Sequence, residues 1–133
     1  MSQTERVRSF DDDLAPQYDR RARFFGKVLI LDGRRWACSQ AVGEVLEVAI
    51  GTGRNLTFYP EGVRLTGIDV SPAMLEIARQ RAHELRRQAD LRVGDAQAMN
   101  FSDERFDTVV CTLSLCCIPD GRKAVAEMKR VLR

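Results

Sequence analysis

Glycines and carboxylates stand at the ends of two apolar runs in the middle of this chain. The run over residues 45–50, interrupted by Glu47, leads into Gly51 and Gly53, and a second run ends at Asp69. Glycine lets the backbone approach a ligand closely, and a carboxylate can accept hydrogen bonds from both hydroxyls of a ribose. A strand, a glycine turn, a helix, a strand and an acid in this order are typical of a unit that binds an adenosine-bearing cofactor.

Two further acids support this interpretation. Asp95 follows Gly94 after a short apolar segment, where a carboxylate could accept from the exocyclic amine of adenine. Glu47 lies inside an apolar strand, which is costly without a partner, so we expect it to organise the glycine turn or to meet an ammonium group. The alternatives are a turn aspartate for Asp95, a helix cap for Asp69 and an exposed strand-end acid for Glu47.

A dinucleotide site is the less favoured alternative. The GxGxxG pattern of NAD-binding domains requires a third glycine, and that position is Leu56 here. A helix packs closely on the strand through that glycine, and Asp95 has no role in the dinucleotide pattern. The sequence therefore argues against a nucleotide-dependent oxidoreductase.

The elements that must position these residues alternate between strands and helices, which predicts an α/β fold with a Rossmann-like parallel sheet of about four strands. We expect an N-terminal helical segment over residues 1–43, loose over 1–13 and broken near Gly33, and a cofactor-binding core over residues 44–133. The strands are expected at 45–49, 64–69, 91–93 and 106–113, and the helices at 54–59, from Pro72 to about 88 with Ser71 as cap, and from 121 to 132.

The fourth strand would lie at the edge of this sheet, because the sequence reaches no fifth strand. A long apolar edge strand invites association. Either the fold is truncated at its C-terminal side, as part of a longer chain, or a second copy covers the edge as a homodimer.

Composition excludes several classes of function. The 133 residues carry a net charge of only +2, although arginines crowd the first quarter of the chain. This is no footprint for nucleic acid, and the arginines indicate a solvated helix or contact with an anionic surface. No apolar run in the sequence is long enough to span a membrane, and the N-terminus lacks the apolar core of a signal peptide. The four cysteines show no spacing typical of a metal site and fit a reducing cytoplasm. His83, the single histidine, is expected on a helix surface.

The chain resembles class I S-adenosylmethionine-dependent methyltransferases over about residues 41–133. The resemblance rests on five segments: residues 46–53, with an acid before spaced glycines, 67–75, 94–101, 106–111 and 127–133. Within the family it is similar to the small-molecule branch of ubiquinone/menaquinone and phospholipid methyltransferases. Residues 58–60 and 110–116 also resemble membrane-associated thiol methyltransferases.

The resemblance implies S-adenosylmethionine, or its product S-adenosylhomocysteine, as cofactor and methyl transfer to a small-molecule acceptor, with peripheral membrane contact compatible. It assigns no catalytic residue and no metal. The implied cofactor-binding residues are Tyr18, Glu47, Ala49, Gly51, Gly53, Asn55, Asp69, Val70, Met74, Asp95, Ala96 and Leu113. Ala49 replaces the first glycine of the family motif.

Three aromatic residues, Phe24, Phe25 and Trp36, are expected in the core rather than in a substrate wall. Tyr18 would cover the methionine end of the cofactor, or would simply pack. The alternative function is a non-catalytic cofactor-binding or dimerising module derived from the same fold.

Overall fold

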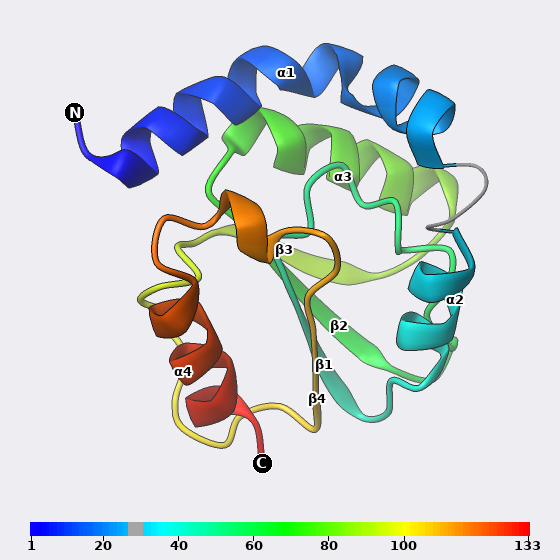
Figure 1. Cartoon of the computed structure of the whole chain (residues 1–133). Helices are drawn as coiled ribbons and strands as arrows, with labels where there is room; N and C mark the ends of the chain where they lie inside the picture. The colour runs from blue at the N-terminus through cyan, green and yellow to red at the C-terminus, as the bar shows by residue number, and fades with distance from the viewer. Residues whose placement is uncertain (27–30) are drawn as a thin grey trace.

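A parallel sheet organises the computed structural model, which describes residues 1–26 and 31–133 (Figure 1). The strand order is β3-β2-β1-β4, so β1 and β2 are central and β4 lies at an edge, as predicted. The strands are β1 (Glu44–Val48), β2 (Arg64–Asp69), β3 (Ala89–Val93) and β4 (Thr108–Val110). Pairing of Val48 with Ile68 brings the carboxyl ends of β1 and β2 to the same edge of the sheet.

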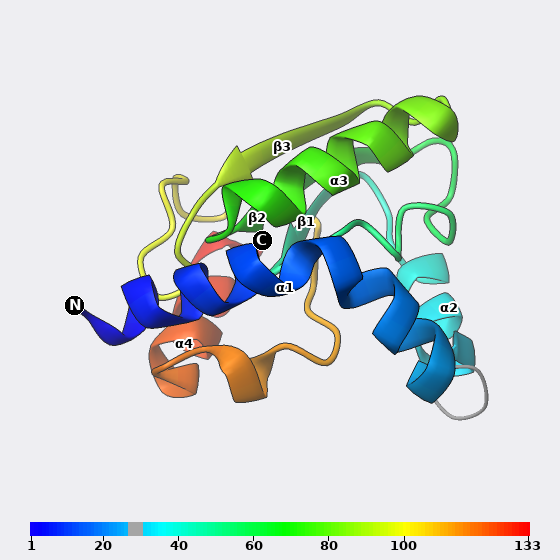
Figure 2. The ribbon, with the colours of Figure 1, turned by 90° about the horizontal axis from the view of Figure 1, so that it is seen from above.

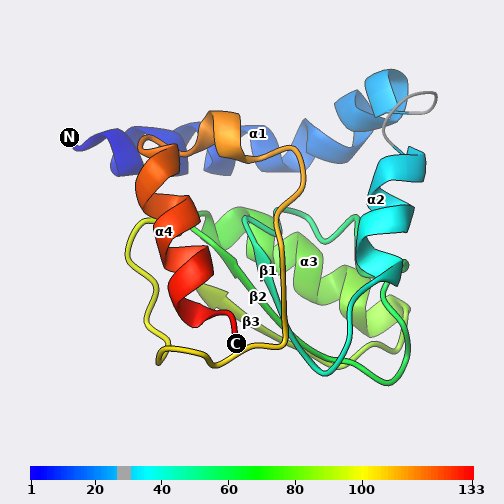
Figure 3. The same ribbon diagram turned by 60° about the horizontal axis from the view of Figure 1, so that its bottom comes forward.

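The two faces of the sheet bury separate parts of the core. Because side chains alternate along a strand, Val45 packs with Leu75 of α3 (Pro72–Glu84) on one face, and Leu46 packs with Val131 of α4 (Gly121–Val131) on the other. Figure 3 shows α3 behind the sheet and α4 in front of it. The sheet is therefore covered on both faces, as a parallel sheet requires.

The predicted start of α3 is confirmed. The Ser71 hydroxyl accepts a hydrogen bond from the Met74 amide at 3.1 Å, and Pro72 occupies the first turn. The helix ends at Glu84, earlier than expected, and His83 is exposed near its end as predicted. Asp120 caps α4 in the same way, because its carboxylate accepts from two amides of the first turn.

The N-terminal segment differs from the prediction. Helix α1 (Gln3–Gly26) begins at Gln3, so residues 3–13 are helical and not loose. Gly33 lies inside α2 (Leu31–Ser39) and does not break a helix. Figure 2 shows α1 running across the sheet and α3, over the end at which the strands finish. No helix among residues 1–26 and 31–133 combines the length and apolar character that crossing a bilayer requires.

Three local predictions are wrong. Residues 54–59 form successive turns instead of a helix, because Asn55 and Leu56 are drawn fully into the core. Strand β4 is shorter than residues 106–113, and Phe106 instead forms a parallel bridge with Leu132 beside it. Trp36 is 69% exposed and does not join the core; the side chains of Phe24 and Phe25 lie outside the described residues.

Candidate active site

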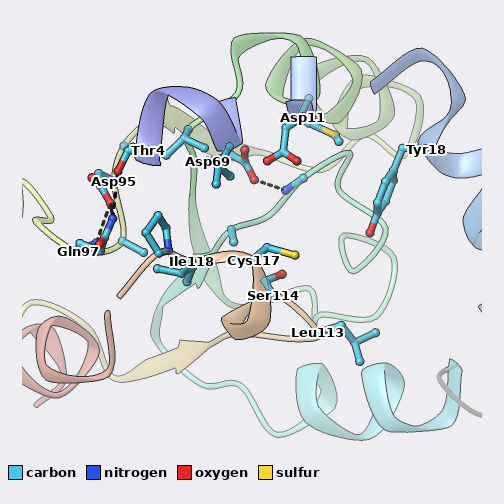
Figure 4. A pocket seen from close by; sticks show the side chains of 18 residues that line it. Thr4, Asp11, Tyr18, Asp69, Asp95, Gln97, Leu113, Ser114, Cys117 and Ile118 are labelled. Carbon is cyan, nitrogen blue, oxygen red and sulfur yellow. Dashed lines mark hydrogen bonds between the residues drawn. The ribbon is translucent and has the colours of Figure 1, made fainter. Parts of the chain in front are cut away.

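A cavity of about 120 Å³ lies between α1 and the carboxyl ends of the strands (Figure 4). Its floor comes from the turns after β1, β2 and β3, its roof from α1, and one wall from the segment around η1 (Leu115–Cys117). The lining residues are Thr4, Val7, Asp11, Tyr18, Ala49, Gly51, Asp69, Val70, Met74, Gly94, Asp95, Ala96, Gln97, Leu113, Ser114, Cys117, Ile118 and Pro119. Ligands bind at this position, outside the carboxyl ends of parallel strands, in open α/β sheets generally.

The glycine turn uses its glycines for two different purposes. At Gly51, with φ +59°, an added Cβ would meet no protein atom within 4 Å, so the backbone faces open space at the cavity. At Gly53, with φ +79°, a Cβ would lie 2.6 Å from Leu56 Cδ1 and 3.2 Å from Ala78 Cβ. Gly51 therefore opens the turn to a ligand, whereas Gly53 lets the turn pack closely against Leu56 and α3.

Ala49 also has a left-handed backbone, with φ +56°. A Cβ atom at such an angle crowds the neighbouring carbonyl oxygen, so glycine is the favoured residue there. The position that carries glycine in the family motif thus has the backbone geometry that favours glycine. Ala49 lines the cavity and also packs against the core cluster that contains Leu46 and Val48.

Asp69 joins the ends of β1 and β2. Its Oδ2 accepts a hydrogen bond from the Gly51 amide at 2.9 Å, and its Oδ1 accepts from the Ser71 amide at 2.9 Å. Asp69 is 7% exposed, and burial raises its pKa while these two amide hydrogen bonds act in the opposite direction. The carboxylate thus fixes the turn and faces the cavity.

Asp95 belongs to a polar network at the other end of the cavity. Its Oδ1 accepts from the Gln97 amide at 2.9 Å and from Gln97 Nε2 at 3.1 Å. Gln97 Nε2 also donates to the Thr4 hydroxyl at 3.2 Å, and its Oε1 accepts from the Asp120 amide at 3.1 Å. Gln97 therefore ties Asp95 to both α1 and the start of α4.

Glu47 lies behind the glycine turn rather than in the main cavity. It is 2% exposed, so the alternative of an exposed strand-end acid is wrong. Its Oε1 accepts from Asn55 Nδ2 at 2.6 Å, and Oε2 has no hydrogen-bond partner among the described residues. Burial raises the pKa of Glu47 to about 7.

A second, smaller cavity of about 20 Å³, large enough for one water molecule, opens beside Glu47. Tyr18, Arg34 and Thr112 contribute to its lining. Asn55 holds this region together: its Oδ1 accepts from Arg34 Nη1 at 3.0 Å, and its Nδ2 also donates to the Thr112 hydroxyl at 2.9 Å. Asn55 therefore acts on the site through Glu47 and Thr112.

Helix α1 forms the roof with one of its faces. Its lining residues are Thr4, Val7, Asp11 and Tyr18, a spacing of three, four and seven that repeats on one side of a helix. Figure 4 shows Asp11 close to Asp69 and Tyr18 farther along the roof.

Three side chains of α1 fasten this roof to the floor. Arg8 Nε donates to the Val70 carbonyl at 2.8 Å, and Asp12 accepts from the Ser71 hydroxyl at 2.5 Å. Asp19 accepts from the Thr52 hydroxyl at 2.6 Å and pairs with Arg81 at 2.5 Å. Part of the arginine-rich N-terminal sequence thus serves contacts within the chain.

The predicted site residues divide into two groups. Tyr18, Ala49, Gly51, Asp69, Val70, Met74, Asp95, Ala96 and Leu113 line the main cavity. Glu47, Gly53 and Asn55 do not, and lie around the turn behind it. Sequence reasoning missed Asp11 and Gln97. Helical spacing from Thr4 to Tyr18 could have revealed Asp11, but residues 1–13 were expected to be loose.

A buried strand, a glycine turn and an acid at the neighbouring strand end define an α/β domain that binds an adenosine-containing cofactor. A sequence model of the "Methyltransferase domain" family matches residues 45–133. The chain is 42% identical over 113 residues to a phosphatidylethanolamine N-methyltransferase of Cereibacter sphaeroides, covering 82% of this chain and 56% of the relative. It is 35% identical to a demethylmenaquinone methyltransferase of Renibacterium salmoninarum, covering 97% and 55%.

Among solved structures, the fold is similar to a SAM-dependent methyltransferase of Thermotoga maritima, described as a possible histamine N-methyltransferase. The TM-score is 0.73 at 25% identity, over 96% of this chain and 57% of that one. The chain therefore belongs to the class I S-adenosylmethionine-dependent methyltransferases. It spans little more than half the length of these relatives.

Proposed function

We propose that the protein transfers a methyl group from S-adenosylmethionine to a small-molecule acceptor, and that the cofactor binds in the cavity beneath α1. The observation that carries this proposal is the carboxylate of Asp69, buried at the cavity floor and hydrogen-bonded to the amide of the open glycine turn at Gly51. A buried carboxylate beside backbone that a ligand can approach supports the assignment of Asp69 as the acceptor for ribose hydroxyls.

The residues present fit this cofactor. Asp69 would receive the ribose hydroxyls, and Asp95 with the apolar Val70 and Ala96 would surround the adenine. Tyr18 and the turn from Ala49 to Gly51 would hold the methionine end, while Met74 completes the floor and Leu113 the wall.

The residues behind the cavity would act indirectly. Asn55 orients Glu47, whose Oε2 lacks a partner among the described residues and can meet an ammonium group. Gly53 keeps the turn packed on α3.

When bound, S-adenosylmethionine supplies a methyl group activated by the positive charge on its sulfur. The chain's own residues then need to align the acceptor and exclude water, and no general base is required. Residues 1–43 act as the lid and acceptor side, and residues 44–133 as the cofactor-binding core. Among described residues, the fastened roof of α1 supports this division.

We infer an amphiphilic or apolar acceptor. Phosphatidylethanolamine and demethylmenaquinone, the compounds in the names of the two relatives, both have large apolar parts. The wall formed by Leu113, Ile118 and Pro119 offers an apolar approach to the cavity. The same proposal includes peripheral contact of the protein with a membrane. It also includes a location in the reducing cytoplasm, which suits the free thiols of the four cysteines.

The second candidate is a non-catalytic cofactor-binding or dimerising module. The position of β4 at the edge of the sheet, with β1 as its only strand partner among the described strands, favours this candidate, because a second copy could pair there. A dimer detected by light scattering, together with cofactor binding and no transfer to amine, thiol or quinol acceptors, would support it over the enzyme.

Calorimetric titration of the chain with S-adenosylhomocysteine, with NAD as comparison, tests the proposal. We expect saturable binding of the former alone. Asp69→Ala should weaken this binding by about 1–3 kcal/mol, because hydrogen bonds to a charged group are lost. Asp90→Ala is the matched control, since Asp90 is an exposed acid outside the cavity. Equal affinity of the Asp69 variant and the parent would remove Asp69 from the site.

A further inference from the structure

Asp11 is an acid of the cavity without a hydrogen-bond or ion-pair partner among residues 1–26 and 31–133. It lies on the roof face of α1 and is half-buried. No described residue donates a hydrogen bond to its carboxylate or forms an ion pair with it. Asp69, which it faces across the cavity (Figure 4), has both oxygens engaged by backbone amides. Asp95 accepts through Oδ1 alone. Asp11 is thus the one acid of this cavity that no described residue contacts with a hydrogen bond or an ion pair on either oxygen.

The charged side chains that line the cavity around Asp11 are acids. Asp11, Asp69 and Asp95 line the cavity, and no lysine or arginine is among the described lining residues. Burial first, and then the charges of Asp69 and Asp12, raise the pKa of Asp11 to about 6. A partly buried anion among anions is unfavourable until a cation arrives, so the arrangement favours a positively charged ligand.

We propose that Asp11 is a specificity-determining residue, whose carboxylate makes the cavity prefer the positively charged S-adenosylmethionine over the neutral-sulfur product S-adenosylhomocysteine. This inference rests on the proposed cofactor site. The two compounds share the adenosine, the ammonium and the carboxylate groups, and they differ in the methyl group and the charge on sulfur. The ratio of their dissociation constants therefore isolates the electrostatic contribution of Asp11 from contacts common to both.

The preference has a consequence for turnover. An acid that attracts the charged form gives no such stabilisation to the neutral form, and after transfer it is left without a partner in the cavity. Asp11 therefore favours exchange of product for fresh cofactor. This differs from the role of Asp69, whose contacts to ribose hydroxyls would be the same for both compounds.

The charge of Asp11 also predicts how the preference varies with pH. The groups that face it are Asp69 at the end of β2, Asp12 beside it on α1, and Cys117 of η1. Arg8, one turn earlier, donates to the Val70 carbonyl and forms no ion pair with Asp11. Because protonation removes the charge of Asp11, the preference for the charged compound should fall when the pH drops below about 6.

The test compares Asp11→Asn with Asp13→Asn. Both variants remove one negative charge from α1, but Asp13 is exposed and does not line the cavity. Each variant and the parent are titrated calorimetrically with both compounds at pH 7.5 and pH 5, after circular dichroism has shown that they are folded.

We expect Asp11→Asn to lower the preference for S-adenosylmethionine about three- to tenfold at pH 7.5, the size of a solvent-screened charge pair in a partly buried site. Asp13→Asn should leave the ratio as in the parent. Lowering the pH to 5 should reduce the ratio more in the parent than in Asp11→Asn.

A ratio unchanged by Asp11→Asn, with both compounds still bound, would overturn this inference and leave the proposed function standing. Failure of the parent to bind either compound would overturn both.

Discussion

Replacing Ala49 by glycine should stabilise the protein, although glycine usually destabilises. Ala49 has φ +56°, and a Cβ atom in this conformation costs about 1–2 kcal/mol. Glycine removes that cost but gives the unfolded chain more freedom, which offsets about 0.5–1 kcal/mol. The net expectation for Ala49→Gly is a gain of about 0.5–1 kcal/mol in the free energy of unfolding.

Ala126→Gly is the matched control, because Ala126 is exposed inside α4. Glycine in a helix interior costs about 1 kcal/mol relative to alanine. The same chemical change should therefore shift the urea midpoint upward at position 49 and downward at position 126, with the free energies of unfolding about 1.5–2 kcal/mol apart.

Urea unfolding followed by circular dichroism measures both variants, with unchanged slopes as the check that unfolding stays comparable. If Ala49→Gly is destabilised as much as Ala126→Gly, then Ala49 carries no strain in solution. The argument that this position suits glycine would then be refuted. Ala49→Val extends the series, because a β-branched residue tolerates positive φ less well than alanine, and it should be the least stable at this position.

Three further changes test the site. Gly51→Ala should reduce S-adenosylhomocysteine binding in calorimetry at least tenfold, because the added methyl projects into open cavity space. Burial raises the pKa of Glu47 to about 7 from 4.5. The free energy of unfolding should therefore fall by up to about 3 kcal/mol as the pH rises from 4.5 to about 7. Glu47→Gln should flatten this pH dependence, measured by urea unfolding at several pH values. Asp19→Asn should loosen the roof, seen as faster hydrogen exchange of α1 amides around Asp19, while exchange in the β1 core stays slow.

The floor of the site could be predicted because its determinants are local. An apolar run followed by glycines specifies β1 and its turn, and the acid at Asp69 follows the next apolar run directly. The Ser71-Pro72 pair specifies the start of α3 from adjacent residues, and the structure confirms it. Register between β1 and β2 then brings the two turns together without further information from distant parts of the chain.

The roof could not be predicted in the same way, because distant contacts hold it. Three consecutive acids at residues 11–13 are typical of a loose segment. Asp12 nevertheless accepts hydrogen bonds from the Ser71 hydroxyl and from the Ala73 amide, and so caps α3 from outside it. The predicted helix over residues 54–59 is absent for a related reason. Their helical propensity is overridden because Asn55 must enter the core to bond Glu47 and Thr112. Trp36 is exposed although aromatic residues usually seek the core.

Along helix α1, three residues that line the cavity are each followed by a residue that anchors the helix, a pattern that composition and hydropathy do not predict. Val7, Asp11 and Tyr18 line the cavity, and the residue after each of them is an anchor: Arg8 to Val70, Asp12 to Ser71, and Asp19 to Arg81. Successive residues of a helix differ by about 100° in direction. Anchors displaced by one position therefore fix the rotation of α1 and turn its lining residues inward.

This rotation matters most for Asp11. An unpaired acid on a free helix would turn toward water, where its charge is better solvated. The anchors before and after it, Arg8 and Asp12, prevent that rotation and hold the carboxylate over the cavity. The partnered acids of α1 thus keep the unpartnered one where a cation can use it, which is why its substitution should change ligand preference while the substitution of its exposed neighbour Asp13 should not.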